Sequence, residues 1–259
     1  YGTMEPMSSP TVLAIANQKG GVAKTTTVAS LGVALVELGH KVLLVDLDPQ
    51  ACLTFSLGID PEDLEDSVHQ VLTKGQDPRD VIVTTEDGVD LLPATIELAR
   101  CEADLLTRTG REYVIRGSLE DLGEYDWVLL DCPPSLGVLT VAALTAATGV
   151  LIPLQCETLS HRGVGQLLDT VYDVRKFTNR DLEVWGVLPT LFDGRTNHSR
   201  AVLDNISQTY ELEVVTPPIP KSIRFAEAPA AGRSILATAR TNKGADAYRE
   251  VAQSLVARG

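Results

Sequence analysis

The sequence predicts an α/β fold in which a doubly wound, mainly parallel sheet is flanked by helices. Strand-like and helix-like segments alternate along the whole chain, as expected for repeated β-α-β units. Apolar runs such as residues 41–46 and 127–131 are nearly continuous, which is typical of strands buried on both faces of a parallel sheet. A glycine-rich turn joins the first strand to the first helix. In such a sheet, ligands bind outside the carboxyl ends of the strands.

The elements follow one another in a regular order. An apolar run gives the first strand, and a helical pattern follows the glycine-rich turn; the later elements are recognised by the same two patterns. Strands are predicted at 11–17, 41–46, 89–92, 127–131, 149–153 and 184–190, with a shorter one near 212–216. Helices are predicted at 25–38, 95–108, 112–122, 137–147, 160–177, 199–209 and 243–257.

We expect a single domain. A chain of 259 residues with 44% apolar residues can bury a sizeable core, and no Pro/Gly/Ser-rich linker or internal repeat divides it. Residues 1–10 are interpreted as a tag remnant with a disordered N-terminus, and residues 11–259 as the domain. No apolar run approaches the ~20 residues that a transmembrane helix needs.

Composition argues against several classes of function. The four cysteines form no C-x-x-C pair and the four histidines have no metal-ligand spacing, so a structural metal held by the protein is not expected. A net charge of −13 argues against a generally basic nucleic-acid binder. One basic face remains compatible with that charge, because binding follows local potential rather than the total.

The glycine-rich turn has the chemistry of a phosphate cradle. Residues 18–26 read Q-K-G-G-V-A-K-T-T between the first strand and the first helix. Glycines let backbone N–H groups turn inward, and the helix N-terminus adds positive potential. Lys24 is placed to reach the β- and γ-phosphates of a nucleotide, and the Thr25 hydroxyl is placed to bind Mg²⁺.

Two aspartate-bearing segments follow later strands. Residues 45–50 read V-D-L-D-P-Q, and the alternation of an extended chain puts Asp46 and Asp48 on the same side. Residues 129–135 read L-L-D-C-P-P-S and deliver Asp131 from an apolar strand. Each segment alone is also compatible with solvated turn carboxylates. Downstream of the cradle, we favour a Mg²⁺–phosphate centre.

The cradle also carries a family resemblance. It departs from the general pattern G-x-x-x-x-G-K-[ST] at Gln18 and Ala23, and fits the variant K-G-G-x-x-K-[ST] instead. That variant, the deviant Walker A motif, resembles the loop of the ParA/MinD family of ATPases. The two aspartate segments are similar to the D-x-D-P-Q and Walker B segments of its ParA branch. Within that branch, the chain resembles the Soj type. That branch usually has glycine at the position of Ala23, where a methyl group is expected to crowd the loop and weaken nucleotide binding or slow turnover.

The resemblance, which covers about residues 11–257, implies slow, partner-stimulated ATP hydrolysis with Mg²⁺. Of the implied catalytic residues Lys19, Lys24 and Asp48, Lys19 would reach the nucleotide of a second subunit and Asp48 would orient the attacking water. The implied ATP/ADP-binding residues are Lys19, Gly20, Gly21, Val22, Ala23, Lys24, Thr25, Thr26, Asp46, Asp131 and Pro220. The implied Mg²⁺ ligands, partly through water, are Thr25, Asp46 and Asp131.

Two arginine-bearing segments resemble the family's non-specific DNA-binding region. Residues 192–198 read F-D-G-R-T-N-H, and residues 219–229 read I-P-K-S-I-R-F-A-E-A-P. A dimer would double these cations on one face, which suits neutralisation of several phosphates. Isolated arginines also serve as solvated or helix-capping groups, and that alternative stays open. The candidate DNA-binding residues are Arg195 and Arg224, with Arg200, Lys221 and Arg233 as companions.

The resemblance thus implies an ATP-dependent homodimer that binds non-specific double-stranded DNA and positions chromosome, plasmid or other cargo with a ParB-like activator. The expected place is the bacterial cytoplasm, at the nucleoid. One alternative is a MinD-like membrane-positioning ATPase, which would require a basic amphipathic C-terminal helix. Residues 245–258 do not have that pattern, so no membrane partner is expected. The other alternative is a metabolic P-loop ligase similar to dethiobiotin synthetase, or an iron–sulfur ATPase, for which the sequence reveals no substrate pocket or cysteine pattern.

Overall fold

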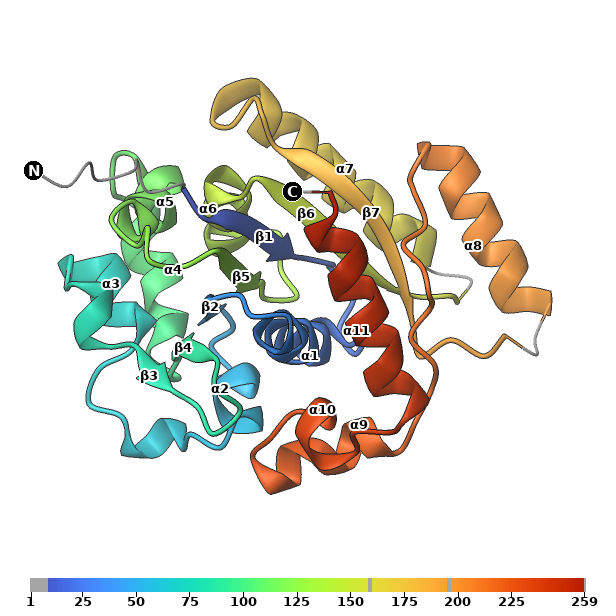
Figure 1. Ribbon diagram of the computed structural model, residues 1–259. Coiled ribbons are helices and arrows are strands. Elements are labelled where there is room, and N and C mark those ends of the chain that lie inside the picture. Colours follow the sequence, from blue (N-terminus) through green and yellow to red (C-terminus); the bar gives the residue numbers. More distant parts are fainter. Residues whose placement is uncertain (1–8, 158–159, 195–196, 259) are drawn as a thin grey trace, which may run out of the picture.

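The computed structural model of the protein describes residues 9–157, 160–194 and 197–258, without the side chains of residues 160, 161, 197 and 198. Most of the predicted N-terminal remnant, residues 1–8, lies outside the described residues. Within them, seven strands form one sheet in the order β3-β4-β2-β5-β1-β6-β7 (Figure 1). All strand pairs in this sheet are parallel except β3–β4. The predicted α/β class is confirmed.

The strands that the apolar runs predict form the middle of the sheet. The strands are β1 (Thr11–Ile15), β2 (Val42–Asp46), β3 (Val83–Thr84), β4 (Asp90–Leu92), β5 (Trp127–Asp131), β6 (Gly149–Gln155) and β7 (Glu183–Thr190). The strand predicted near 212–216 was wrong, because this segment forms only an isolated bridge between Val187 and Val214. The edge strand β3 was missed, since two residues are too few to show a pattern.

The long helices match the predicted periodic segments, and the short ones do not. The helices are α1 (Lys24–Glu37), α2 (Cys52–Ser56), α3 (Val68–Lys74), α4 (Leu98–Leu106), α5 (Val114–Leu119), α6 (Val138–Ala146), α7 (Ser160–Phe177), α8 (Asn197–Tyr210), α9 (Arg224–Glu227), α10 (Ile235–Thr238) and α11 (Lys243–Val256). The helix predicted at 112–122 is a 3-10 turn followed by the shorter α5. Helices α2, α3, α9 and α10 were missed because they span two turns or fewer. A capping box of Ser67 and Gln70 marks the start of α3 in the sequence.

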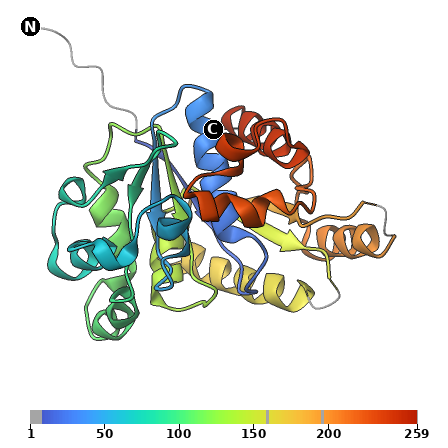
Figure 2. The same ribbon diagram turned by 90° about the horizontal axis from the view of Figure 1, so that it is seen from below.

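Helices cover both faces of the sheet (Figures 1 and 2). Helices α1, α10 and α11 lie on one face, α4 to α7 lie on the other, and α8 lies beside β7. The C-terminal helix α11 packs on α1, where the hydroxyls of Thr27 and Tyr248 form a buried hydrogen bond of 2.9 Å. This contact ties the end of the chain to the helix that follows the cradle.

The central strands are buried on both sides. Along β1, Leu13 and Ile15 pack into the core under α1 and α11, whereas Val12 and Ala14 pack into the core of the other face. The alternation follows from the two-residue period of a strand. It explains why these strands read as continuous apolar runs.

Parallel pairing brings the chemistry-bearing strand ends together. β1 pairs with β5, and β5 pairs with β2, so that Ile15, Asp131 and Asp46 occupy corresponding positions in neighbouring strands. The cradle therefore begins beside two aspartates. The fold thus brings all three motifs together at the carboxyl ends of the central strands.

Candidate active site

The cradle loop is held from two sides by polar side chains. Asn17, which is buried, accepts a hydrogen bond from the backbone N–H of Lys19 (3.0 Å) and donates one to the carbonyl of Pro153 in β6 (2.8 Å). On the far side, the Thr190 hydroxyl at the end of β7 donates to the carbonyl of Val22 (2.8 Å). The sequence patterns did not predict these two side-chain roles. The only sequence signal for either residue is a polar side chain at the end of a buried strand.

Two residues of the loop adopt left-handed backbone conformations. Gly21 has φ +74°, which glycine adopts without strain. Ala23 has φ +65° at the N-cap of α1, where an L-residue with a Cβ costs about 1–2 kcal/mol. The position at which this chain departs from the usual glycine is therefore strained in the backbone.

Lys24 lies at the centre of the site. Its ammonium group is mostly buried and donates to the carbonyl of Lys19 (3.3 Å), which closes the loop upon itself. Burial lowers the pKa of Lys24, while the nearby carboxylates of Asp131 and Asp48 favour its charged form. The structure thus brings together three residues that the sequence predicted from separate motifs.

Asp131 is a buried carboxylate at the end of β5. Both of its side-chain oxygens lack a hydrogen-bond partner within the described residues. Burial, and then the neighbouring Asp46, raise the pKa of Asp131 well above its usual value, whereas Thr25 and Lys24 lower it. Mg²⁺ prefers oxygen ligands, and unpaired carboxylate oxygens beside a hydroxyl supply them. These residues fit a magnesium ion, and their role as ligands remains a prediction.

Asp46 has a different environment, although it faces the same edge. Its carboxylate accepts hydrogen bonds from the backbone N–H of Asp48 (3.1 Å) and from the N–H (2.9 Å) and hydroxyl (2.7 Å) of Thr54. Burial raises its pKa to about 6. Asp46 thus builds the loop that carries Asp48, and its predicted contact with the metal remains a prediction.

Lys19 stands at the head of the loop with about a third of its side chain exposed. Its ammonium group forms an ion pair with Glu157, just beyond β6. Beside it lies a pocket of about 460 Å³, lined in part by Asn17, Pro134 and Arg162. Lys19 is therefore accessible from outside the loop.

Pro220, a predicted nucleotide-binding residue that we assign to the adenine base, lies in a segment that runs alongside the end of β7. Residues 219–221 run alongside residues 189–192: the N–H of Ile219 donates to the carbonyl of Pro189 (2.7 Å), and that of Phe192 donates to the carbonyl of Ile219 (2.9 Å). Thr190 lies between them and contacts the cradle through Val22. This places Pro220 on the side of the loop next to β7, while its contact with a base remains a prediction.

Comparison with known proteins identifies the family. A family described as an AAA domain matches residues 10–184. The sporulation initiation inhibitor protein Soj of Bacillus subtilis is 42% identical over 250 residues, which cover 96% of this chain and 99% of Soj. The chromosome partitioning protein ParA of Caulobacter vibrioides is 41% identical over 251 residues, or 95% and 94% of the two chains. The chain belongs to the ParA/Soj family of ATPases.

A solved relative of this ParA/Soj chain carries a different name. A crystal structure titled cobyrinic acid a,c-diamide synthase, from Mycobacterium smegmatis, is 56% identical, has a TM-score of 0.86 and covers 95% of this chain and 94% of its own. That structure contains ADP and magnesium, and a second structure of the same protein contains an ATP analogue and magnesium.

The candidate DNA-binding residues of this ParA/Soj chain differ in what they contact. Arg195 lies outside the described residues. Arg200 donates to the carbonyl of Gly194 (2.8 Å), and Lys221 is exposed. Arg224 is 58% exposed and forms an ion pair with Glu227 one turn further along the chain (2.7 Å). Exposed cations of this kind are compatible with phosphate contacts.

Arg233 instead joins two parts of the fold. Its guanidinium binds the carboxylate of Asp87 (2.6 Å), whose side chain is 1% exposed, and lies 3.6 Å from that of Glu86. The N–H of Ser234 donates to the same Asp87 carboxylate (2.6 Å). The structure therefore gives Arg233 a structural role, and we leave it out of the DNA-binding proposal.

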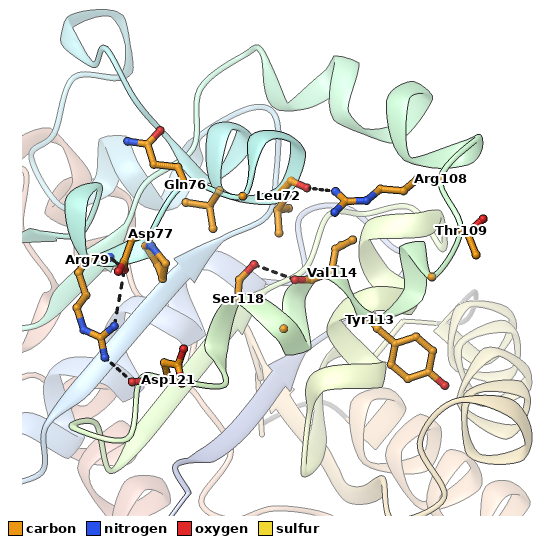
Figure 3. A pocket seen from close by; sticks show the side chains of 15 residues that line it. Leu72, Gln76, Asp77, Arg79, Arg108, Thr109, Tyr113, Val114, Ser118 and Asp121 are labelled. Carbon is orange, nitrogen blue, oxygen red and sulfur yellow. Dashed lines mark hydrogen bonds and ion pairs between the residues drawn. The ribbon is translucent and has the colours of Figure 1, made fainter.

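A pocket of about 490 Å³ lies away from the cradle, between α3 and α5 (Figure 3). Its two arginines are used within the protein. Arg79 forms an ion pair with Glu124 (3.0 Å), and Arg108 donates to the carbonyl of Leu72 (2.7 Å). Both guanidinium groups in the lining are thus already engaged, and the pocket is not part of the candidate active site.

Asp131→Asn is expected to stabilise the ligand-free protein at neutral pH. Because burial raises the folded-state pKa, folding binds a proton more tightly, and stability falls as pH rises from about 4 towards that raised pKa. Removing the charge should raise the free energy of unfolding by about 1–3 kcal/mol at pH 7.5, with the gain shrinking towards pH 4. Urea unfolding at both pH values measures it. The exposed control Asp104→Asn should stay within about 0.5 kcal/mol of wild type, and a less stable Asp131→Asn would contradict the burial argument.

Ala23→Gly is expected to relieve backbone strain in the loop. The gain from the left-handed conformation exceeds the added freedom of glycine in the unfolded chain, so the free energy of unfolding should rise by up to about 1 kcal/mol. The matched control is Ala29→Gly, in the regular interior of α1, which should lose about 1 kcal/mol. Equal losses in the two variants would show that the loop is not strained at residue 23.

Proposed function

We propose that this chain is an ATP-dependent switch that dimerises around Mg²⁺–ATP, binds DNA without sequence preference and resets by hydrolysis. The proposal rests on one arrangement: the buried carboxylate of Asp131, which has no hydrogen-bond partner among the described residues, and the buried ammonium of Lys24 lie at a loop whose head carries a second, accessible lysine. The relatives named Soj and ParA, the second of which is a chromosome partitioning protein, support a role in partitioning.

Different residues of the site would bind the phosphates, hold Mg²⁺ and orient the attacking water. Backbone N–H groups of the cradle and Lys24 bind the phosphates and stabilise the charge that spreads over the transferred group. Thr25 and Asp131 would hold Mg²⁺, which when bound neutralises the β- and γ-phosphate oxygens. Asp48 lies close enough to Lys24 and Asp131 to influence their pKa values, and we assign it the role of orienting a water near the γ-phosphate.

Lys19 is the residue that makes dimerisation part of the mechanism. Lys24 already supplies the cation of its own loop, and the Lys19 ammonium points away to Glu157. We assign Lys19 to the nucleotide of a second copy, where a cation supplied in trans is worth ~10³–10⁵ in rate where measured. Glu157 would release Lys19 when a phosphate offers more negative charge.

The DNA-binding face would combine Arg224 and Lys221 with Arg200 and Arg195. Few cations per copy give weak binding, and association of two copies doubles the phosphates neutralised. ATP binding would thus control DNA affinity, and a ParB-like partner would accelerate hydrolysis and release. The proposed place of action is the nucleoid of a bacterial cell.

A second function is favoured by one of the solved relatives. The 56% identical chain is titled cobyrinic acid a,c-diamide synthase, which would make this chain a metabolic ligase. Incubation of the protein with ATP, Mg²⁺, glutamine and cobyrinic acid, followed by mass spectrometry, would detect the a,c-diamide. Formation of the a,c-diamide would contradict the proposed switch function and support the ligase function.

The decisive test of the switch is ATP turnover with and without non-specific duplex DNA, using two lysine variants. Lys24→Ala should lose ATP binding and turnover together, because the cradle loses its cation. Lys19→Ala should still bind ATP but remain monomeric by light scattering and lose about 10³-fold in turnover. Lys74→Ala, an exposed lysine on α3, serves as the control and should match wild type. Normal dimerisation and turnover of Lys19→Ala would overturn the role in trans.

The DNA face is tested by Arg195→Ala combined with Arg224→Ala. Binding to unrelated duplexes should weaken equally, and the slope of log K against log[salt] should become shallower by about 0.9 for each phosphate that the variant no longer neutralises. The charge-matched control is Arg100→Ala with Arg180→Ala, two arginines on other parts of the surface. Equal weakening in both double variants would indicate a net-charge effect rather than a DNA face.

A further inference from the structure

The residue that carries this inference is Thr54, in the short helix α2. Its side chain is fully buried, and it lies eight residues after Asp46 in a helix that the sequence pattern did not predict. Its backbone N–H and its hydroxyl both contact Asp46.

The Thr54 hydroxyl is shared between the ends of two strands. It donates to the carboxylate of Asp46, at the end of β2 (2.7 Å), and accepts from the N–H of Ala94, just beyond β4 (2.9 Å). The Thr54 N–H donates to the same Asp46 oxygen (2.9 Å). All of these groups are buried. Removal of the hydroxyl would leave the Ala94 N–H without this acceptor, at a cost of about 1–3 kcal/mol, and would leave the Thr54 N–H as the only donor to this Asp46 oxygen within the described residues.

The other Asp46 oxygen holds the residue that matters for hydrolysis. It accepts the backbone N–H of Asp48 (3.1 Å), and the Asp48 carbonyl accepts the N–H of Ala51 (2.9 Å). One carboxylate therefore fixes the start of the Asp48 loop and the helix at its end. The hydroxyl that fixes the carboxylate fixes the loop as well.

We propose that Thr54 is a positioning residue for Asp48: its hydroxyl locks the Asp46 carboxylate between β2 and β4, and thereby holds the Asp48 loop in place. The proposal rests on the proposed function, in which Asp48 orients the attacking water. A displacement of such a group by about 1 Å can lower a rate by about 10²-fold. Thr54 acts on the chemical step without touching the nucleotide.

The test uses Thr54→Val, which keeps the shape of the side chain and removes the hydroxyl. The turnover number should fall between about tenfold and a hundredfold, whereas the affinity for ATP, measured by equilibrium binding, should change less than about twofold. Thr54→Ser keeps the hydroxyl and should restore turnover to within about threefold of wild type. Should Thr54→Val not fold, Thr54→Ala removes the same hydroxyl without placing a methyl group against the Ala94 amide.

Two comparisons separate positioning from stability. Thr145→Val removes a hydroxyl that is equally buried in another part of the fold, where it bonds to the carbonyl of Val141 (2.8 Å), and should leave turnover unchanged. In an Asp48→Ala background, Thr54→Val should cause no further loss, because it acts through Asp48. Full additivity in this cycle, or wild-type turnover in Thr54→Val, would overturn the proposal.

Amide hydrogen exchange distinguishes failure of this inference from failure of the proposed function. In Thr54→Val the Asp48 amide should exchange at least about tenfold faster than in wild type, and in Thr145→Val it should not. Unchanged exchange at Asp48 would refute the positioning role whatever the turnover. Faster exchange together with a fully active Asp48→Ala would keep the positioning and refute the catalytic role of Asp48.

Discussion

The burial of charged groups at the carboxyl edge of the sheet is the constraint on which the rest of the structure depends. Asp46, Asp131 and Lys24 lie within one small region and are almost fully removed from water. Burial of an unpaired charge costs several kcal/mol, so each group needs either a partner or a function. Asp46 has three hydrogen-bond donors, whereas Asp131 has none within the described chain. This contrast separates a carboxylate that holds a loop from one that is left available to a ligand.

The central strands of the sheet fix the relative positions of these charged groups. β1, β5 and β2 are paired along their lengths and buried on both faces, so their ends are fixed relative to one another. The segments that carry Asp48 and Arg224 run into the short helices α2 and α9.

The Asp48 side of the site is also in contact with the C-terminal segment. Gly58, two residues after α2, lies against Gly232: a Cβ on Gly232 would be 2.8 Å from the Gly58 Cα. Both glycines have positive φ angles, and Arg233 next to them is bound to the buried carboxylate of Asp87. The helix beyond the Asp48 loop and the segment that carries Arg224 thus meet backbone to backbone, with no side chain between them to absorb a movement.

The sequence by itself determined the fold class, the central strands and the cradle, because apolar periodicity and glycine spacing are local properties of the chain. It also predicted Lys24, Asp48 and Asp131 as site residues, since each lies in a motif at the end of a strand, and the structure brings the three close together. Only the tertiary structure decided which carboxylate is satisfied, because the donors to Asp46 come from Thr54, in a helix too short to leave a periodic pattern, and from the Asp48 backbone. The same holds for Asn17 and Arg233, whose partners Pro153 and Asp87 lie more than a hundred residues away in the chain. Hydrogen bonds between distant segments depend on how the strands are ordered, and local patterns do not contain that order.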